Sequence, residues 1–173
     1  MMLHALQVST LLLVLIAMAL SLAHALELPG KLRLPREAYM VVQPMYYPGF
    51  TLGGLVGEFG GILSTLALLI ATPAGSRSFW LILAALFALL AMNAVYWLLT
   101  HPVNGFWLRG QKLDRAGAGF FKFDPTGRGR TSGHPRLNWT ALRDRWEYSH
   151  VVRAALALAA LILLAIAVTD GAS

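Results

Sequence analysis

The sequence predicts an all-α protein, an integral membrane four-helix up-down bundle with a long basic loop between its third and fourth helices. Of the 173 residues, 57% are hydrophobic and 13% are charged, whereas charged residues make up about a quarter of ordinary soluble domains. Mean hydropathy is +0.62. So few charges could not cover the surface of a soluble domain of this length, and lipid is therefore the expected solvent for much of the chain.

Four apolar runs define the predicted helices, each close to the ~20 residues that cross the hydrocarbon core. The spans lie at about residues 6–26, 50–72, 79–100 and 139–169, within a single domain of residues 1–173. A backbone inside lipid must satisfy its own hydrogen bonds, so each run is expected to be helical. The fourth helix is predicted to begin before its apolar run, in a cytoplasmic extension that Asn138 or Thr140 can cap.

The first apolar run has a second interpretation, as a cleaved signal peptide. Ala23-His24-Ala25 fits a small-x-small cleavage site. The segment before Leu11, however, contains no Lys or Arg, so the positive region that opens a signal peptide is missing. We therefore expect the run to be retained as the first span.

Basic residues gather in two of the three linkers. The chain carries 14 Lys and Arg residues against 8 Asp and Glu, a net charge of +6. Most of the basic residues lie in the linkers 27–48 and 101–150, which share one side of a four-span bundle. The positive-inside rule places that side in the cytoplasm and both termini outside it. The basic charge is expected to contact anionic lipid headgroups, so the bilayer is the predicted partner and nucleic acid is not.

Several classes of chemistry are excluded by what the sequence lacks. The chain contains no cysteine, which excludes disulfides, thiolate metal ligands and a cysteine nucleophile. It also contains no phosphate-binding glycine loop, no nucleophile elbow and no zincin motif. Candidate chemistry therefore rests on the histidines and carboxylates.

Titratable side chains are predicted to converge on one membrane face. The end of the first span, the start of the second, the end of the third and the start of the fourth lie together in an up-down bundle. Three histidines and three glutamates occupy these positions, while the opposite face holds only His4 and Asp170. The six residues are His24, Glu27, Glu58, His101, Glu147 and His150.

Their spacing indicates metal chemistry. His24 and Glu27, and again Glu147 and His150, stand three residues apart on one helix face. A Glu-x-x-His pair is how di-metal bundle proteins present a carboxylate and an imidazole. The six residues are therefore a candidate metal site, with iron the most expected metal, or two of the histidines ligate a haem. The candidate catalytic residues are Glu58, Glu147 and His150, and the candidate cofactor-binding residues are His24, His101 and Asn104.

Ordinary explanations exist for parts of this pattern. Each histidine lies near the interface, where it could simply hydrogen-bond a headgroup or a loop. Glu58 is harder to explain in this way, because a carboxylate inside a span costs about 2.5–3.5 kcal/mol and usually faces a partner in the bundle. Gly53, Gly57 and Gly61 repeat every four residues, and we attribute them to close helix packing.

Further expectations concern the membrane boundary. Pro102 is expected to move His101 out of helical geometry, so that the third helix ends or kinks there. Residues 119–123, Gly-Phe-Phe-Lys-Phe, are typical of an interfacial anchor. Four other aromatic residues are expected to form a belt at the membrane interface. The alternative is that they form the wall of a pocket for a flat apolar substrate. These rings are Tyr46, Tyr47, Trp107 and Trp146.

A family resemblance spans nearly the whole chain. It rests on residues 21–31 (SLAHALELPGK), 46–50 (YYPGF), 101–104 (HPVN) with Phe106-Trp107, and 142–146 (LRDRW) ahead of His150 and Arg153. These segments resemble the small bacterial four-helix membrane proteins grouped with the anthrone oxygenases. The resemblance implies a multi-pass protein of the bacterial inner membrane and suggests oxygenation of aromatic polyketides as the reaction class.

Two classes of function follow. The first is a membrane-embedded oxidoreductase or oxygenase that acts on a hydrophobic, aromatic or quinone-like small molecule at the His/Glu cluster near the cytoplasmic face. The second is a non-catalytic or haem-binding subunit, or an assembly factor, with other membrane subunits as partners. The clustering of titratable groups favours the first class, whereas small size and the lack of a soluble domain suit the second.

Reporter fusions test the predicted orientation. A reporter at Ser173 should lie outside the cytoplasm and one inserted within residues 126–136 inside it, because basic linkers are retained on the cytoplasmic side. Phosphatase and fluorescent reporters, which are active on opposite sides of the membrane, measure this in cells. A cytoplasmic C-terminus would contradict the arrangement.

Overall fold

The computed structural model describes residues 1–108, 115–123, 125 and 138–170. Within these residues the chain is helical and has no strand, so the predicted all-α class is confirmed. Four helices are long and apolar enough to cross a membrane, and the chain is a multi-pass membrane protein. The single-domain organisation, the bacterial inner membrane and the side on which the termini lie stay predictions. The four helices are α1 (Met2–Lys31), α3 (Gly49–Ala71), a continuous helix over Arg77–Trp107, and α7 (Trp139–Asp170).

The third membrane helix combines α4 (Arg77–Val95), a π-helical turn η2 (Tyr96–Thr100) and α5 (His101–Trp107). The expectation that Pro102 moves His101 out of helical geometry is wrong, because His101 has φ −57° and ψ −43°. Proline lacks an N–H group, and this is tolerated where the helical hydrogen-bond pattern restarts. The π turn supplies that change of pattern just before Pro102, and the helix continues to Trp107.

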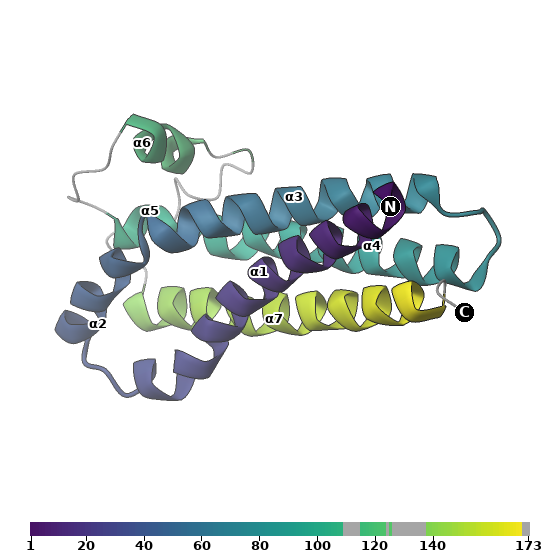
Figure 1. The fold of residues 1–173 in the computed structure, drawn as a ribbon. Coiled ribbons are helices and arrows are strands. Elements are labelled where there is room, and N and C mark those ends of the chain that lie inside the picture. The colour runs from purple at the N-terminus through teal and green to yellow at the C-terminus, as the bar shows by residue number, and fades with distance from the viewer. Residues whose placement is uncertain (109–114, 124, 126–137, 171–173) are drawn as a thin grey trace.

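Shorter elements gather at one end of the bundle (Figure 1). The linker after α1 forms α2 (Arg36–Val42) and the 3₁₀ turn η1 (Gln43–Tyr46), and α6 (Arg115–Lys122) follows the third membrane helix. The Gly- and Arg-rich stretch 126–136 of the long basic loop lies outside the described residues. In Figure 1, α3, α4 and α7 run alongside one another and α1 crosses them obliquely. The start of α1 and the end of α7 lie together at the end opposite α2 and α6, as an up-down bundle requires.

Helix ends follow local sequence signals. In the turn between α3 and α4, Gly75 has a φ of +84°, which glycine adopts without steric cost. Ser76 then caps α4 by accepting a hydrogen bond from the Phe79 N–H at 3.1 Å. Asn138 caps α7 in the same way, accepting from the Thr140 N–H at 3.2 Å. The prediction that the fourth helix begins ahead of its apolar run is therefore confirmed.

The interior of the bundle has an apolar part and a polar part. A core of apolar side chains, including Val14, Leu68, Ile82, Leu89 and Leu164, joins α1, α3, α4 and α7. The buried ionisable side chains lie nearer the other end, where α2 and α6 are found. They are His24, Lys31, Glu58, His101, Glu147, His150 and Arg153.

Helices α1 and α3 approach each other closely along a glycine face. A Cβ atom at Gly57 would lie 2.8 Å from the Ala17 backbone nitrogen, and one at Gly61 would lie 3.2 Å from the Val14 Cγ2 atom. Distances this short leave no room for a side chain, so the attribution of the glycines to close packing is confirmed. This approach brings the polar end of α1 against α3.

Gly57→Ala should lower the free energy of unfolding by about 1–3 kcal/mol, because the added methyl group overlaps the backbone of α1. Thermal unfolding of the detergent-solubilised protein measures the change. Gly54→Ala is the matched control on the same helix, since a Cβ atom there would meet only the Glu58 Oε1 atom at 3.7 Å. Equal melting temperatures for Gly57→Ala and the wild type would contradict the close approach.

Candidate functional site

A cavity lies at the polar end of the bundle. The volume of the cavity is about 100 Å³. A cavity needs ~10–15 Å³ to hold a single water molecule. All four membrane helices contribute to its wall, together with η1 and α6. Among the described residues that line it, Glu58 and Arg153 carry charge. The cavity is therefore large enough for several water molecules and has one ion pair in its wall.

Aromatic rings form much of the wall. The four rings for which a belt was favoured all line the cavity, so they form a pocket wall instead of a belt. The interfacial anchor at residues 119–123 stays a prediction, but α6 packs against α5 and places Phe120 and Phe121 on the cavity. The Phe121 ring stacks on His101 with centroids 6.1 Å apart. Phe123, by contrast, is exposed.

Glu58 and Arg153 form a buried ion pair between α3 and α7. Arg153 Nη2 donates a hydrogen bond to Glu58 Oε1. Arg153 is 5% exposed and Glu58 is 7% exposed. The guanidinium also lies 5.1 Å from the centroid of the Tyr96 ring. The expectation that Glu58 faces a partner inside the bundle holds, but that partner is a cation.

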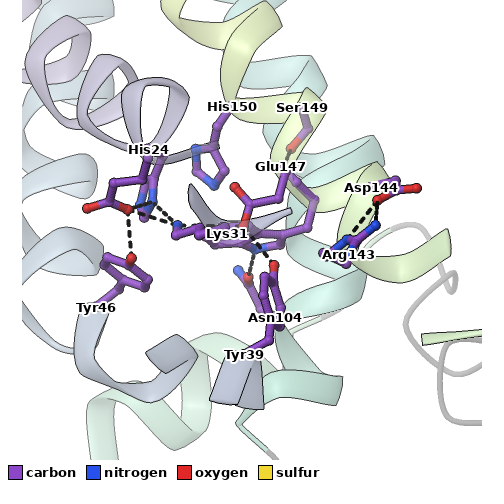
Figure 2. A network of polar contacts seen from close by, with 12 residues as sticks. His24, Lys31, Tyr39, Tyr46, Asn104, Arg143, Asp144, Glu147, Ser149 and His150 are labelled. Atoms are coloured by element: carbon purple, nitrogen blue, oxygen red, sulfur yellow. Dashed lines mark hydrogen bonds and ion pairs between the residues drawn. The ribbon is translucent and has the colours of Figure 1, made fainter. Parts of the chain in front are cut away.

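Lys31 forms a second charged centre at the end of α1 (Figure 2). Its ammonium group lies 2.9 Å from Glu27 Oε2 and 3.6 Å from Glu147 Oε1, and 3.4 Å from His24 Nδ1. It also lies 4.4 Å from the centroid of the Tyr46 ring. Although Lys31 is only 4% exposed, its charge is therefore balanced by carboxylates from α1 and α7.

Two tyrosines complete this centre by donating to the carboxylates. Tyr39 Oη donates to Glu147 Oε1 at 2.8 Å, and Tyr46 Oη donates to Glu27 Oε2 at 2.6 Å. Burial, together with the adjacent Glu147 carboxylate, raises the pKa of Tyr39 well above its usual range. Burial and the hydrogen bond to Glu27 raise the pKa of Tyr46 in the same direction. Both phenols therefore stay protonated and act as donors.

Two imidazoles are in contact at the cavity wall. The ring centroids of His24 and His150 are 4.1 Å apart, and both residues line the cavity. Arg153 Nη1 lies 3.1 Å from His150 Nδ1, and a guanidinium can only donate. Lys31 Nζ approaches His24 Nδ1 in the same way. In each neutral ring Nδ1 is therefore the acceptor and Nε2 carries the hydrogen, which assigns these rings to donor roles.

His101 belongs to a separate chain of hydrogen bonds. Its Nε2 donates to the Phe123 carbonyl at 2.6 Å, so its Nδ1 accepts from the Tyr96 hydroxyl at 3.1 Å. Asn104 accepts a hydrogen bond from Trp146 Nε1 at 2.7 Å. Tyr96, Asn104 and Trp146 line the cavity, whereas His101 is not among its lining residues. His101 therefore orients the wall from behind.

The predicted six-residue metal site is not assembled. Within the described part of the chain, no group of three or more His, Asp or Glu side chains could hold a metal ion. The physical reason is that the carboxylates are already paired, Glu58 with Arg153 and Glu147 with Lys31. A metal ion would have to displace a buried cation from each carboxylate, so the donors present do not fit a metal.

A haem between two histidines does not fit either. The rings of His24 and His150 are in direct contact, whereas a metal ion between two imidazoles lies about 2.0–2.1 Å from each nitrogen and would hold the rings further apart. His101 has both ring nitrogens in hydrogen bonds. His24 and His150 also hold Lys31 and Arg153 through their Nδ1 atoms.

The sequence analysis missed the two cations, Lys31 and Arg153. Lys31 counts there only as a basic linker residue, although its spacing of seven from His24 puts both on one helix face. Arg153 lies within the fourth apolar run, where a charge indicates an interior partner as strongly as Glu58 does. Pairing these two in-span charges of opposite sign would have found the ion pair.

Comparison with known protein families agrees with the resemblance noted in the sequence. A sequence model of the family described as anthrone oxygenase matches residues 48–163. The chain belongs to the anthrone oxygenase family. The matched anthrone oxygenase region contains Glu58, His150 and Arg153, while α1 and its residues His24 and Lys31 precede it. Comparisons with curated proteins and with solved structures gave no match.

Lys31→Met should lower the free energy of unfolding by about 3–5 kcal/mol, because Glu147 would keep a buried charge without its cation. Adding Glu147→Gln should recover most of this loss, since Gln retains an acceptor for Tyr39 and removes the charge. Chemical unfolding of the single and double variants in one detergent measures the coupling.

The exposed pair at the other end of the bundle is the matched control. Arg77 Nε lies 3.3 Å from Asp170 Oδ2, with the Arg77 side chain 77% exposed. Arg77→Met should therefore change stability by only about 0–1 kcal/mol. Strictly additive effects of Lys31→Met and Glu147→Gln would contradict the buried centre.

Proposed function

We propose that the protein is a membrane-embedded oxygenase that acts on a flat hydrophobic aromatic compound reaching the cavity from the bilayer. The observation that carries the proposal is the Glu58–Arg153 pair, set in a wall whose other described residues are aromatic, apolar or uncharged polar. The pair offers a proton acceptor beside a fixed cation. Membership of the anthrone oxygenase family supplies the reaction class.

The substrate class follows from the wall. Rings from η1, α5 and α7 surround the cavity, and aromatic side chains bind flat aromatic ligands through offset stacking and edge contacts. A substrate of this kind partitions into the bilayer, which is where a cavity between membrane helices can receive it. The family name suggests an aromatic ketone with a methylene group, as in anthrone.

Glu58 is proposed as the base that removes a proton from this methylene group. The transfer moves one negative charge from the carboxylate to the substrate while Arg153 stays beside both. The charge in the cavity therefore does not change, and the developing anion meets a cation that is already in place. Such preorganised electrostatic stabilisation is strong where water is excluded.

The remaining steps need O₂ as the only oxidant. The substrate carbanion adds O₂ to form a carbon–oxygen bond, and protonated Glu58 returns its proton to the outer peroxide oxygen. Glu58 then removes the second methylene hydrogen as the oxygen–oxygen bond breaks, which leaves a carbonyl group and releases hydroxide. Hydroxide takes the proton from Glu58 and leaves as water. One methylene group and one O₂ thus give one carbonyl group and one water.

The other two predicted catalytic residues act through neighbours. His150 Nδ1 accepts from Arg153 and so fixes the orientation of the guanidinium. Glu147 does not line the cavity, and its contact with Lys31 joins α7 to α1. Both are therefore positioning residues in this proposal, and Glu58 alone keeps its predicted catalytic role.

Glu58→Gln should lower kcat for anthrone oxygenation by about 10²–10⁴-fold, the usual contribution of a general base. The assay follows O₂ consumption and anthraquinone formation by purified protein in lipid nanodiscs, corrected for oxidation in empty nanodiscs. Glu37→Gln is the matched control, because Glu37 is exposed on α2 and should leave kcat unchanged.

Two outcomes would count against the proposal. Full activity of Glu58→Gln would remove the base from the mechanism. A wild-type protein that leaves anthrone oxidation at the rate of empty nanodiscs, although it folds and retains the α1–α7 contacts, would favour the alternative of a non-catalytic subunit or assembly factor.

A further inference from the structure

Two of the residues that line the cavity are also exposed at the outer surface of the bundle. Leu55 is 43% exposed and Phe59 is 42% exposed, whereas the other described residues of the wall are buried or half-buried. A side chain that belongs both to a cavity wall and to the outer surface marks a place where the cavity reaches that surface. The cavity therefore opens at Leu55 and Phe59, on α3.

The opening lies on the side of α3 that faces away from α1. Gly53 faces α1, because a Cβ atom there would lie 2.9 Å from Leu20 Cδ1. Leu55 follows two residues later, which is a rotation of about 200° around the helix axis, and Phe59 lies one turn further along the same face. Helix α3 packs against α1 and α4. The third membrane helix, which contributes Tyr96 to the wall, therefore borders the opening.

The opening lies at the depth of the hydrocarbon core. Helix α3 begins at Gly49, and at a rise of about 1.5 Å per residue Leu55 and Phe59 lie about 9 and 15 Å along it. Because the apolar run of α3 crosses a hydrocarbon core about 30 Å thick, both side chains contact acyl chains. Glu58 directly precedes Phe59, so the opening leads to the buried ion pair.

The other sides of the cavity are closed by contacts between helices. The rings of His24 on α1 and His150 on α7 are 4.1 Å apart. Thr100 Oγ1 lies 2.7 Å from Ser149 Oγ, between the third membrane helix and α7. Toward the charged end, the described lining residues of η1, α5 and α6 are buried or half-buried. The described part of the wall is therefore open toward lipid and covered toward the aqueous side.

We propose that the opening is a lateral portal through which a flat apolar molecule dissolved in the bilayer enters the cavity, and that Leu55 and Phe59 control its access. The inference rests on the proposed function in using the same cavity, and it adds the route of entry and the two residues that set it. The portal leads to Glu58 and Arg153. A lipid acyl chain has no polar group to place beside this ion pair, so the occupant is a small molecule.

The position of the two side chains lets the portal widen. A cavity that holds several water molecules must expand to admit a molecule of several rings. Side chains in a close-packed core cannot move without disturbing their neighbours, whereas Leu55 and Phe59 lie at the lipid-facing edge of the wall. A change of rotamer at these positions enlarges the opening and leaves the contacts on the other sides in place.

Thiol accessibility tests this route, because the chain contains no cysteine. Ser21 lines the cavity and is 2% exposed, so Ser21→Cys places a thiol inside it with little change in shape. The full-length variant in nanodiscs is treated with N-phenylmaleimide, which is neutral and enters lipid, or with a sulfonated maleimide, which stays in water. After each rate is divided by that with a free thiol in solution, the neutral reagent should react at least about tenfold faster, since moving a charge into the hydrocarbon core is costly.

Larger side chains at the portal should slow the neutral reagent. Leu55→Trp and Phe59→Trp, each combined with Ser21→Cys, narrow the opening and should slow modification several-fold, whereas Phe59→Ala should speed it. Leu63→Trp is the matched control and should leave the rate unchanged. Leu63 lies one turn beyond Phe59 on α3 and is 65% exposed, but it does not line the cavity.

Equal normalised rates for the two maleimides would place the entrance on the aqueous side and overturn the inference. Unchanged rates in both tryptophan variants would overturn it, as would a folded cysteine variant that is modified only after denaturation. Thr51→Cys, at a second lining position, gives the same measurement if Ser21→Cys does not fold. Modification needs no turnover, so a portal in a protein that does not oxidise anthrone would uphold this inference and reject the oxygenase.

Discussion

The structure depends on the neutralisation of charge inside a bundle that lipid surrounds. Removing a charge from water is so unfavourable that each buried ion must find its partner within the protein. Glu58 meets Arg153 between α3 and α7, and Lys31 meets Glu27 and Glu147 between α1 and α7. These contacts fix how three helices meet at one end of the bundle. The other end is held by apolar packing, and the cavity lies at the charged end.

The two charged centres have different relations to solvent, and this gives them different roles. Glu27 is 42% exposed on its side chain, and the centre around Lys31 therefore reaches the surface of the bundle. The pair of Glu58 and Arg153 lies deeper and faces the cavity. The contact between His24 and His150 joins the two centres. A change in charge at Lys31 can therefore alter the electrostatic environment of Arg153 through these two rings.

Much of the fold could be predicted from the sequence, because the length and apolarity of a span reflect the thickness of the bilayer and little else. The site was harder. Glu58 stood out because a carboxylate inside a span needs a partner, yet the partner depends on how the helices rotate about their axes, which packing decides. The Glu-x-x-His spacing indicated a metal site. Spacing along one helix carries no information about Lys31 and Arg153, the cations that pair with the carboxylates. The aromatic rings were placed in a belt because composition does not distinguish a ring facing headgroups from one facing a cavity.

The π-helical turn η2 has a consequence for how this chain relates to others of its family. A π turn holds one residue more than an α turn, and one residue corresponds to about 100° of rotation around the helix axis. Deleting a single residue between Tyr96 and Thr100 would restore a regular helix and leave Asn104 and Trp107 on the cavity, whereas deleting one from α4 outside the turn would rotate both by about 100°. Sequence alignments that ignore this extra residue would pair the lining positions of α5 with lipid-facing ones. The segments before and after the π turn should therefore be aligned separately.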